Sequence, residues 1–73
     1  MKVSLNAIEK VKTFCNVAMN QDYDVSLVSG RYVIDAKSIM GIFSLDLSKP
    51  VELCIEGDVD IETVKETFKD FLV

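Results

Sequence analysis

The chain has 73 residues, of which 49% are hydrophobic and 27% charged, so it can form one compact core and is predicted to be a single domain over residues 1–73. Its formal net charge of -4 argues against nucleic acid as a partner, because phosphate binding requires a basic surface. The sequence lacks the run of about 20 apolar residues that crosses a membrane. It contains no histidine, the commonest metal ligand and general base, so we expect no metal site and no cofactor.

The first elements predicted are a short strand and a helix. In the strand, residues 1–5, Val3 and Leu5 share one face. The next four residues fit a capping box in which Asn6 caps the helix and Glu9 reaches back to it. The helix is predicted over residues 7–19. Its apolar side chains at helical spacing are Ile8, Val11, Phe14, Cys15, Ala18 and Met19.

A hairpin and a second, much shorter helix are predicted next. Apolar and polar residues alternate over residues 22–27 and again over residues 31–35, which is typical of half-buried strands. Ser29-Gly30 predicts a tight turn between them, because glycine supplies the positive φ that a two-residue hairpin loop needs. The alternation then ends, and a short apolar helix is predicted over residues 38–44.

The chain closes with one strand and one helix. The strand is predicted over residues 51–56, and Asp58 or Asp60 caps the helix. The buried stripe of this helix is predicted to be Ile61, Val64, Phe68, Phe71 and Leu72. Because each strand has one polar side for solvent, the element order βαββαβα predicts an α+β open-faced sandwich, with one antiparallel sheet and all helices on a single face.

The two cysteines, Cys15 and Cys54, lie far apart in the sequence and not at the spacing of metal ligands. The sequence shows no signal-peptide pattern, which indicates a cytoplasmic protein whose thiols stay reduced. We therefore interpret both cysteines as small hydrophobic side chains without a disulfide.

Charge is distributed unevenly along the chain. Residues 50–73 carry seven carboxylates and two lysines, a net charge of -5, which leaves +1 for residues 1–49. An anionic partner would therefore bind the first two thirds of the chain, and the acidic face of the last helix is interpreted as a solvated surface.

The short helix and its flanks, residues 36–45, read Ala-Lys-Ser-Ile-Met-Gly-Ile-Phe-Ser-Leu. Ser38 is placed to cap the helix through its hydroxyl. A helix this short must be held by packing, yet it has more apolar side chains than one small face can bury. We therefore expect some of Ile39, Met40 and Phe43 to be exposed, and exposed apolar clusters commonly mark partner surfaces.

Residues 36–45 closely resemble the regulatory-serine segment of HPr, the phosphocarrier of the bacterial sugar phosphotransferase system, and the resemblance extends from about residue 22 to residue 73. It implies a four-stranded antiparallel sheet with three helices on one face. It also implies that Ser38 is a regulatory phosphorylation site for an ATP-dependent HPr kinase. The partner-docking residues implied by the resemblance are Lys37, Ile39, Met40 and Phe43.

The resemblance fails where the HPr family carries its phosphoryl group, on a histidine at the start of the first helix with an arginine and a proline nearby. Asn6 and Ala7 stand about where the histidine run would be, Glu9 falls near the arginine position and Lys10 near the proline position. No nitrogen nucleophile remains, and a carboxylate would repel phosphate. We therefore predict no phosphotransfer, as in the catabolite-repression branch of HPr proteins.

The leading interpretation is a non-enzymatic HPr-like module, a monomer or weak homodimer, that binds a protein partner such as HPr kinase, a transcriptional regulator or a metabolic enzyme. One alternative is a phosphocarrier that uses Ser4, Thr13 or Cys15. Another is a structural scaffold that interacts through its sheet or residues 38–45. In the plainest interpretation Ser38 is only a helix cap and the apolar residues around it are only core.

Overall fold

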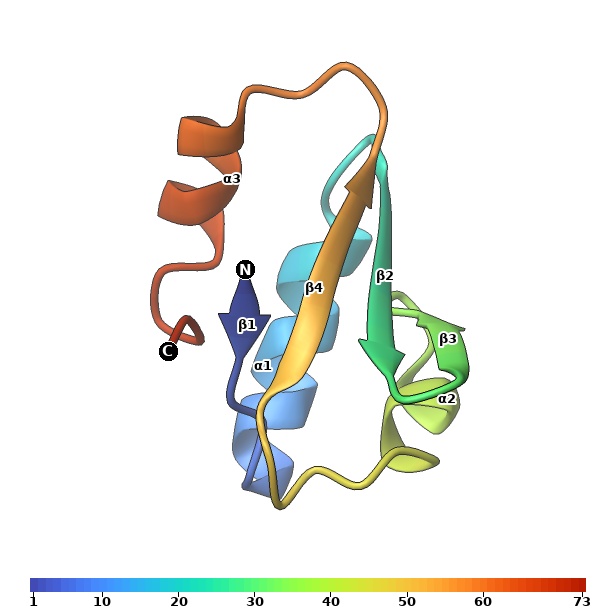
Figure 1. Cartoon of the computed structure of the whole chain (residues 1–73). Coiled ribbons are helices and arrows are strands. Elements are labelled where there is room, and N and C mark those ends of the chain that lie inside the picture. The colour runs from blue at the N-terminus through green and yellow to red at the C-terminus, as the bar shows by residue number, and fades with distance from the viewer.

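The computed structural model describes all 73 residues and has the predicted element order (Figure 1). Four strands form one antiparallel sheet in the order β1-β4-β2-β3. The strands are β1 (Lys2–Val3), β2 (Asp24–Ser29), β3 (Tyr32–Asp35) and β4 (Val51–Glu56). The helices are α1 (Ile8–Met19), α2 (Ile39–Phe43) and α3 (Ile61–Thr67). The open-faced α+β sandwich is confirmed, with α1 crossing the covered face of the sheet.

The core consists of 16 buried residues, all of them hydrophobic. Alternate residues of the central strands, such as Val25 and Leu27 of β2, point into it, as the period of a strand requires. Phe14 of α1 lies at its centre, with ring centroids 5.3 Å from both Phe68 and Phe71. This aromatic cluster packs the C-terminal segment against α1.

The hairpin is confirmed with its turn shifted by one residue. Ser29 pairs with Tyr32, so the two-residue loop is Gly30-Arg31 and not Ser29-Gly30. Gly30 has a φ of 60°, a conformation that other residues adopt only with strain. Asp60 is the N-cap residue of α3, but its carboxylate accepts from the Thr63 hydroxyl and not from a backbone N–H.

The predicted capping box at the start of α1 is wrong. Ala7, not Asn6, occupies the N-cap position, and no side chain accepts a hydrogen bond there. The buried residues Leu5 and Val11 flank this turn, so core packing sets where the helix begins. The first intrahelical bond accordingly runs from the Val11 N–H to the Ala7 carbonyl, at 3.1 Å.

Three residues predicted as core are exposed: Ile8 and Met19 of α1 and Ile61 of α3. Ile8 and Met19 are 62% and 59% exposed. They are separated by about three helical turns, so they share one flank of α1, and that flank is not the one against the sheet. Ile61 is the first residue of α3, ahead of the buried Val64.

Both cysteines are free; Cys15 is buried, and Cys54 is half-buried on the opposite face of the sheet. No group of three or more metal-binding side chains comes together. None of the three helices is both long enough and apolar enough to cross a membrane.

Candidate functional site

Ser38 is exposed and caps α2, as predicted. Its backbone is extended, with a φ of -104°, and its Oγ accepts a hydrogen bond from the Gly41 N–H at 3.2 Å. A Cβ at position 41 would lie 3.4 Å from that hydroxyl oxygen, so glycine keeps the space beside it open. The hydroxyl is therefore held at the first turn of the helix and remains accessible.

The turn before Ser38 is held by hydrogen bonds on several sides. The Lys37 N–H donates to Asp35 Oδ1 at 2.9 Å, and the Ser38 N–H donates to the Asp35 carbonyl at 3.0 Å. The Lys37 ammonium donates to the Gln21 carbonyl just beyond α1, at 3.0 Å. Lys37 therefore ties the two helices together and does not point freely at Ser38.

The buried Cys15 contacts the same turn from the hydrophobic core. Its thiol donates to the Lys37 carbonyl, with 3.6 Å between Sγ and oxygen. Burial, and secondarily the charge of Asp35, raises the pKa of the Cys15 thiol, so the donor proton is retained. The turn before Ser38 is thus connected to α1 by two hydrogen bonds, one from the Lys37 ammonium and one from the buried Cys15 thiol.

The apolar side chains of α2 divide as the sequence predicts. Ile42 is fully buried and anchors the helix, whereas Ile39, Met40 and Phe43 are exposed, Met40 by 78%. With Ile8 and Met19 of α1 they form what we call the α1–α2 surface, whose members are Ile8, Met19, Ile39, Met40 and Phe43. The sequence predicts Ile8 and Met19 as core residues, although their spacing of three turns is a signal that they share a flank.

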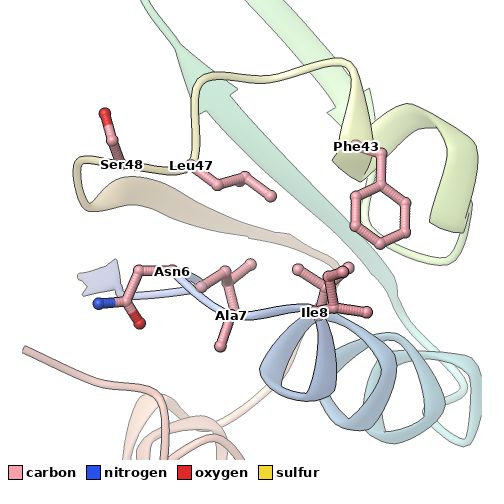
Figure 2. A pocket seen from close by; sticks show the side chains of 8 residues that line it. Asn6, Ala7, Ile8, Phe43, Leu47 and Ser48 are labelled. Atoms are coloured by element: carbon pink, nitrogen blue, oxygen red, sulfur yellow. The ribbon is translucent and has the colours of Figure 1, made fainter.

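Two shallow grooves run between these helices. Figure 2 shows the first, in which Ile8 and Phe43 approach each other above the start of α1; its volume is about 300 Å³. It is lined by Leu5, Asn6, Ala7, Ile8, Val11, Phe43, Leu47 and Ser48. The second groove, of about 430 Å³, is lined by Lys12, Cys15, Asn16, Met19, Lys37 and Ile39. No carboxylate lines either groove, and the only charged residues of their linings are Lys12 and Lys37 at the second groove.

The start of α1 holds no histidine. The exposed Ala7 occupies the N-cap, beside the exposed amide of Asn6. Of the alternative acceptors, Cys15 is buried and the Thr13 hydroxyl donates to the Glu9 carbonyl at 2.9 Å within the helix.

No protein-family model matches the sequence, and no curated protein resembles it significantly. Among solved structures, the chain superimposes on the crystal structure of HPr-C-His from Thermoanaerobacter tengcongensis with a TM-score of 0.79. The two sequences are 24% identical, and the match covers 97% of this chain and 88% of that chain. The comparison establishes that the chain has the HPr fold, which confirms the predicted architecture.

Proposed function

We propose that this protein is an HPr-like binding module that docks a protein partner on its α1–α2 surface. The observation that carries the proposal is the set of exposed apolar side chains from two helices along the grooves, together with the exposed serine that caps α2. Fully burying one such side chain contributes about 1.5–3 kcal/mol. Lys12 and Lys37 at the second groove favour a partner with an acidic rim. A transcriptional regulator or a metabolic enzyme is the kind of partner we expect.

Phosphorylation of Ser38 by an HPr kinase would control this docking. A phosphate adds about -1.5 to -2 units of charge and strong acceptor oxygens. Ser38 Oγ already accepts from the Gly41 N–H, so a phosphate there would meet the free N–H groups of the first turn. It would introduce negative charge between Ile39 and Lys37, changing the chemistry of the surface far more than the fold.

The phosphorylation proposal is tested with HPr kinase and ATP, followed by mass spectrometry of the intact chain. We expect one added phosphate, which Ser38→Ala abolishes. Ser44→Ala is the matched control, because Ser44 is an exposed serine at the other end of the same helix and donates to the Gly41 carbonyl. A chain that stays unmodified, or one modified equally in Ser38→Ala, contradicts the switch.

The docking surface is tested by titrating the same kinase, in a form that cannot transfer phosphate, with variants of this chain. Met40→Asp should weaken binding by at least about tenfold, equivalent to about 1.4 kcal/mol. Ile61→Asp is the control, since Ile61 is also an exposed apolar residue in a helix but lies outside the α1–α2 surface. Equal affinities of the two variants would show that the kinase docks elsewhere.

A further inference from the structure

The free edge of the sheet presents a second unpartnered surface, separate from the α1–α2 surface. β3 is the last strand in the order β1-β4-β2-β3 and pairs only with β2 (Figure 1). Tyr32 and Val33 are 68% and 67% exposed. We propose that β3 pairs antiparallel with β3 of a second copy of this chain, about a two-fold axis at Val33, which joins the two sheets into one of eight strands.

The backbone alternation of β3 decides which groups are available. In a two-residue hairpin the residues flanking the loop exchange hydrogen bonds, so Tyr32 and then Ile34 direct their N–H and C=O groups toward β2. The Ala36 N–H continues this alternation by donating to the Val25 carbonyl at 2.9 Å. Val33 therefore directs its N–H and C=O to the free edge, and Asp35 directs its N–H there, whereas the Asp35 carbonyl already accepts from the Ser38 N–H.

Side-chain charge then selects the register. A two-fold axis at Val33 places Arg31 opposite Asp35 of the second copy, and the symmetry repeats this pair. Arg31 is exposed and forms no ion pair within the chain. The Asp35 Oδ1 atom accepts from the Lys37 N–H, which leaves Oδ2 for a cation. A two-fold axis at Ile34 would instead oppose Arg31 to Lys37, a repulsive pair, so the Val33 register is preferred.

The middle of β3 also lacks what usually protects an edge strand. Lysine, proline and bulges commonly prevent edge pairing, and none occurs between Tyr32 and Ile34. On the open face Val33 stands beside Val28 of β2. The joined sheet would therefore carry a row of four valines across the axis, and Tyr32 would stand opposite Ile34 of the copy. Cross-strand pairs of aromatic and β-branched residues are favourable.

Sedimentation equilibrium from micromolar to millimolar concentration tests the pairing. We expect the mass of the unmodified chain to rise toward two chains, and Val33→Pro to remain monomeric at every concentration. Proline removes the Val33 N–H, which β2 does not use, so the circular dichroism of the monomer should be retained. Met40→Asp is the control and should dimerise normally, because it changes only the α1–α2 surface.

Cross-linking tests the register. In a Cys54→Ser background the remaining Cys15 is buried. Val33→Cys should then form an intermolecular disulfide, because directly opposed Cα atoms are about 5.5 Å apart. Tyr32→Cys should not, because its counterpart across the axis is offset and lies beyond the roughly 7 Å that a disulfide spans. A chain that is monomeric throughout, a dimer that survives Val33→Pro, or equal cross-linking at both positions would overturn the proposal.

Discussion

The two helices of the candidate site begin in different ways. α1 begins after Ala7, whose extended backbone has the geometry of a cap but whose side chain has no oxygen to accept an N–H. α2 begins after Ser38, whose Oγ accepts from the Gly41 N–H. α1 has 12 residues and buries four of them, whereas α2 has five and buries only Ile42. A long, well-packed helix can dispense with a cap that a short one requires.

This difference bears on function as well as stability. The start of α1 carries Asn6, Ala7 and Ile8, which line an apolar groove, and its N-cap residue has no side-chain oxygen. The start of α2 carries an exposed hydroxyl held in place by a network of hydrogen bonds. In the proposed function the start of α2 is the phosphorylation site, whereas the start of α1 contributes apolar lining to a groove. Substitutions at each start measure what stabilises it.

The largest effect is expected from Phe14→Ala, since α1 depends on packing. Phe14 is fully buried against Phe68 and Phe71, so removing its ring should cost about 3–5 kcal/mol. Urea denaturation measures the loss, and Phe14→Leu gives a milder variant if the alanine variant does not fold. Lys12→Ala, on an exposed side of the same helix, should change stability by less than about 0.5 kcal/mol. Similar values for the two positions would contradict the view that packing holds α1.

Ser38→Ala should have an intermediate effect. Loss of the cap should cost about 1 kcal/mol and should increase amide hydrogen exchange at Gly41, whose N–H loses its acceptor. Ser38→Asp keeps an acceptor oxygen at the same place and should retain most of the stability. If alanine and aspartate behave alike, the hydrogen bond to Gly41 does not stabilise α2.

Ala7→Ser should act in the opposite direction. Ala7 already has a φ of -143° and a ψ of 146°, so a serine hydroxyl could cap α1 without a backbone change. We expect a gain of about 0.5–1 kcal/mol in the free energy of unfolding, measured by urea denaturation. Ala7→Val, which adds bulk without an acceptor, should show no gain. An unchanged serine variant would mean that packing alone decides this helix start.

The smallest effect concerns pH. Because the pKa of the Cys15 thiol is raised in the folded state, mainly by burial, the folded chain retains this proton to higher pH than the unfolded chain does. The contribution of this thiol to the free energy of unfolding is therefore complete below its pKa in the unfolded chain. That contribution is lost as the pH rises through its pKa in the folded chain. Urea midpoints between pH 7 and about pH 10 should fall more for the unmodified chain than for Cys15→Ala. If the urea midpoints of the two chains change in parallel with pH, ionisation of Cys15 does not affect stability.

Thiol labelling gives an independent check on the same residue. Cys54 is half-buried on the open face of the sheet and should react with a thiol reagent in the folded chain, whereas Cys15 should react only after unfolding. Equal labelling rates in the folded chain would show that the turn before Ser38 opens readily. A turn that opens readily would not hold α2 in a fixed position for docking.

Much of the fold and part of the candidate site can be predicted from the sequence. The alternation in β2, β3 and β4 and the helical spacing in α1 correctly predict each element to within about two residues. Ser38 is correctly predicted as a cap because capping depends on a local pattern within one turn. The Asn6–Glu9 capping box is just as local, yet it is wrong because the packing of Leu5 and Val11 moves the helix start by one residue.

What the sequence alone determined is therefore the set of elements, their order and the acceptor at Ser38, since each depends on neighbours within a few residues. Only the tertiary structure decided that Ile8 and Met19 are exposed next to α2 and that Lys37 and Cys15 connect α2 to α1. Hydrophobic periodicity shows which side chains share a flank of a helix. It does not show whether a neighbouring element covers that flank, because the cover comes from residues distant in the chain.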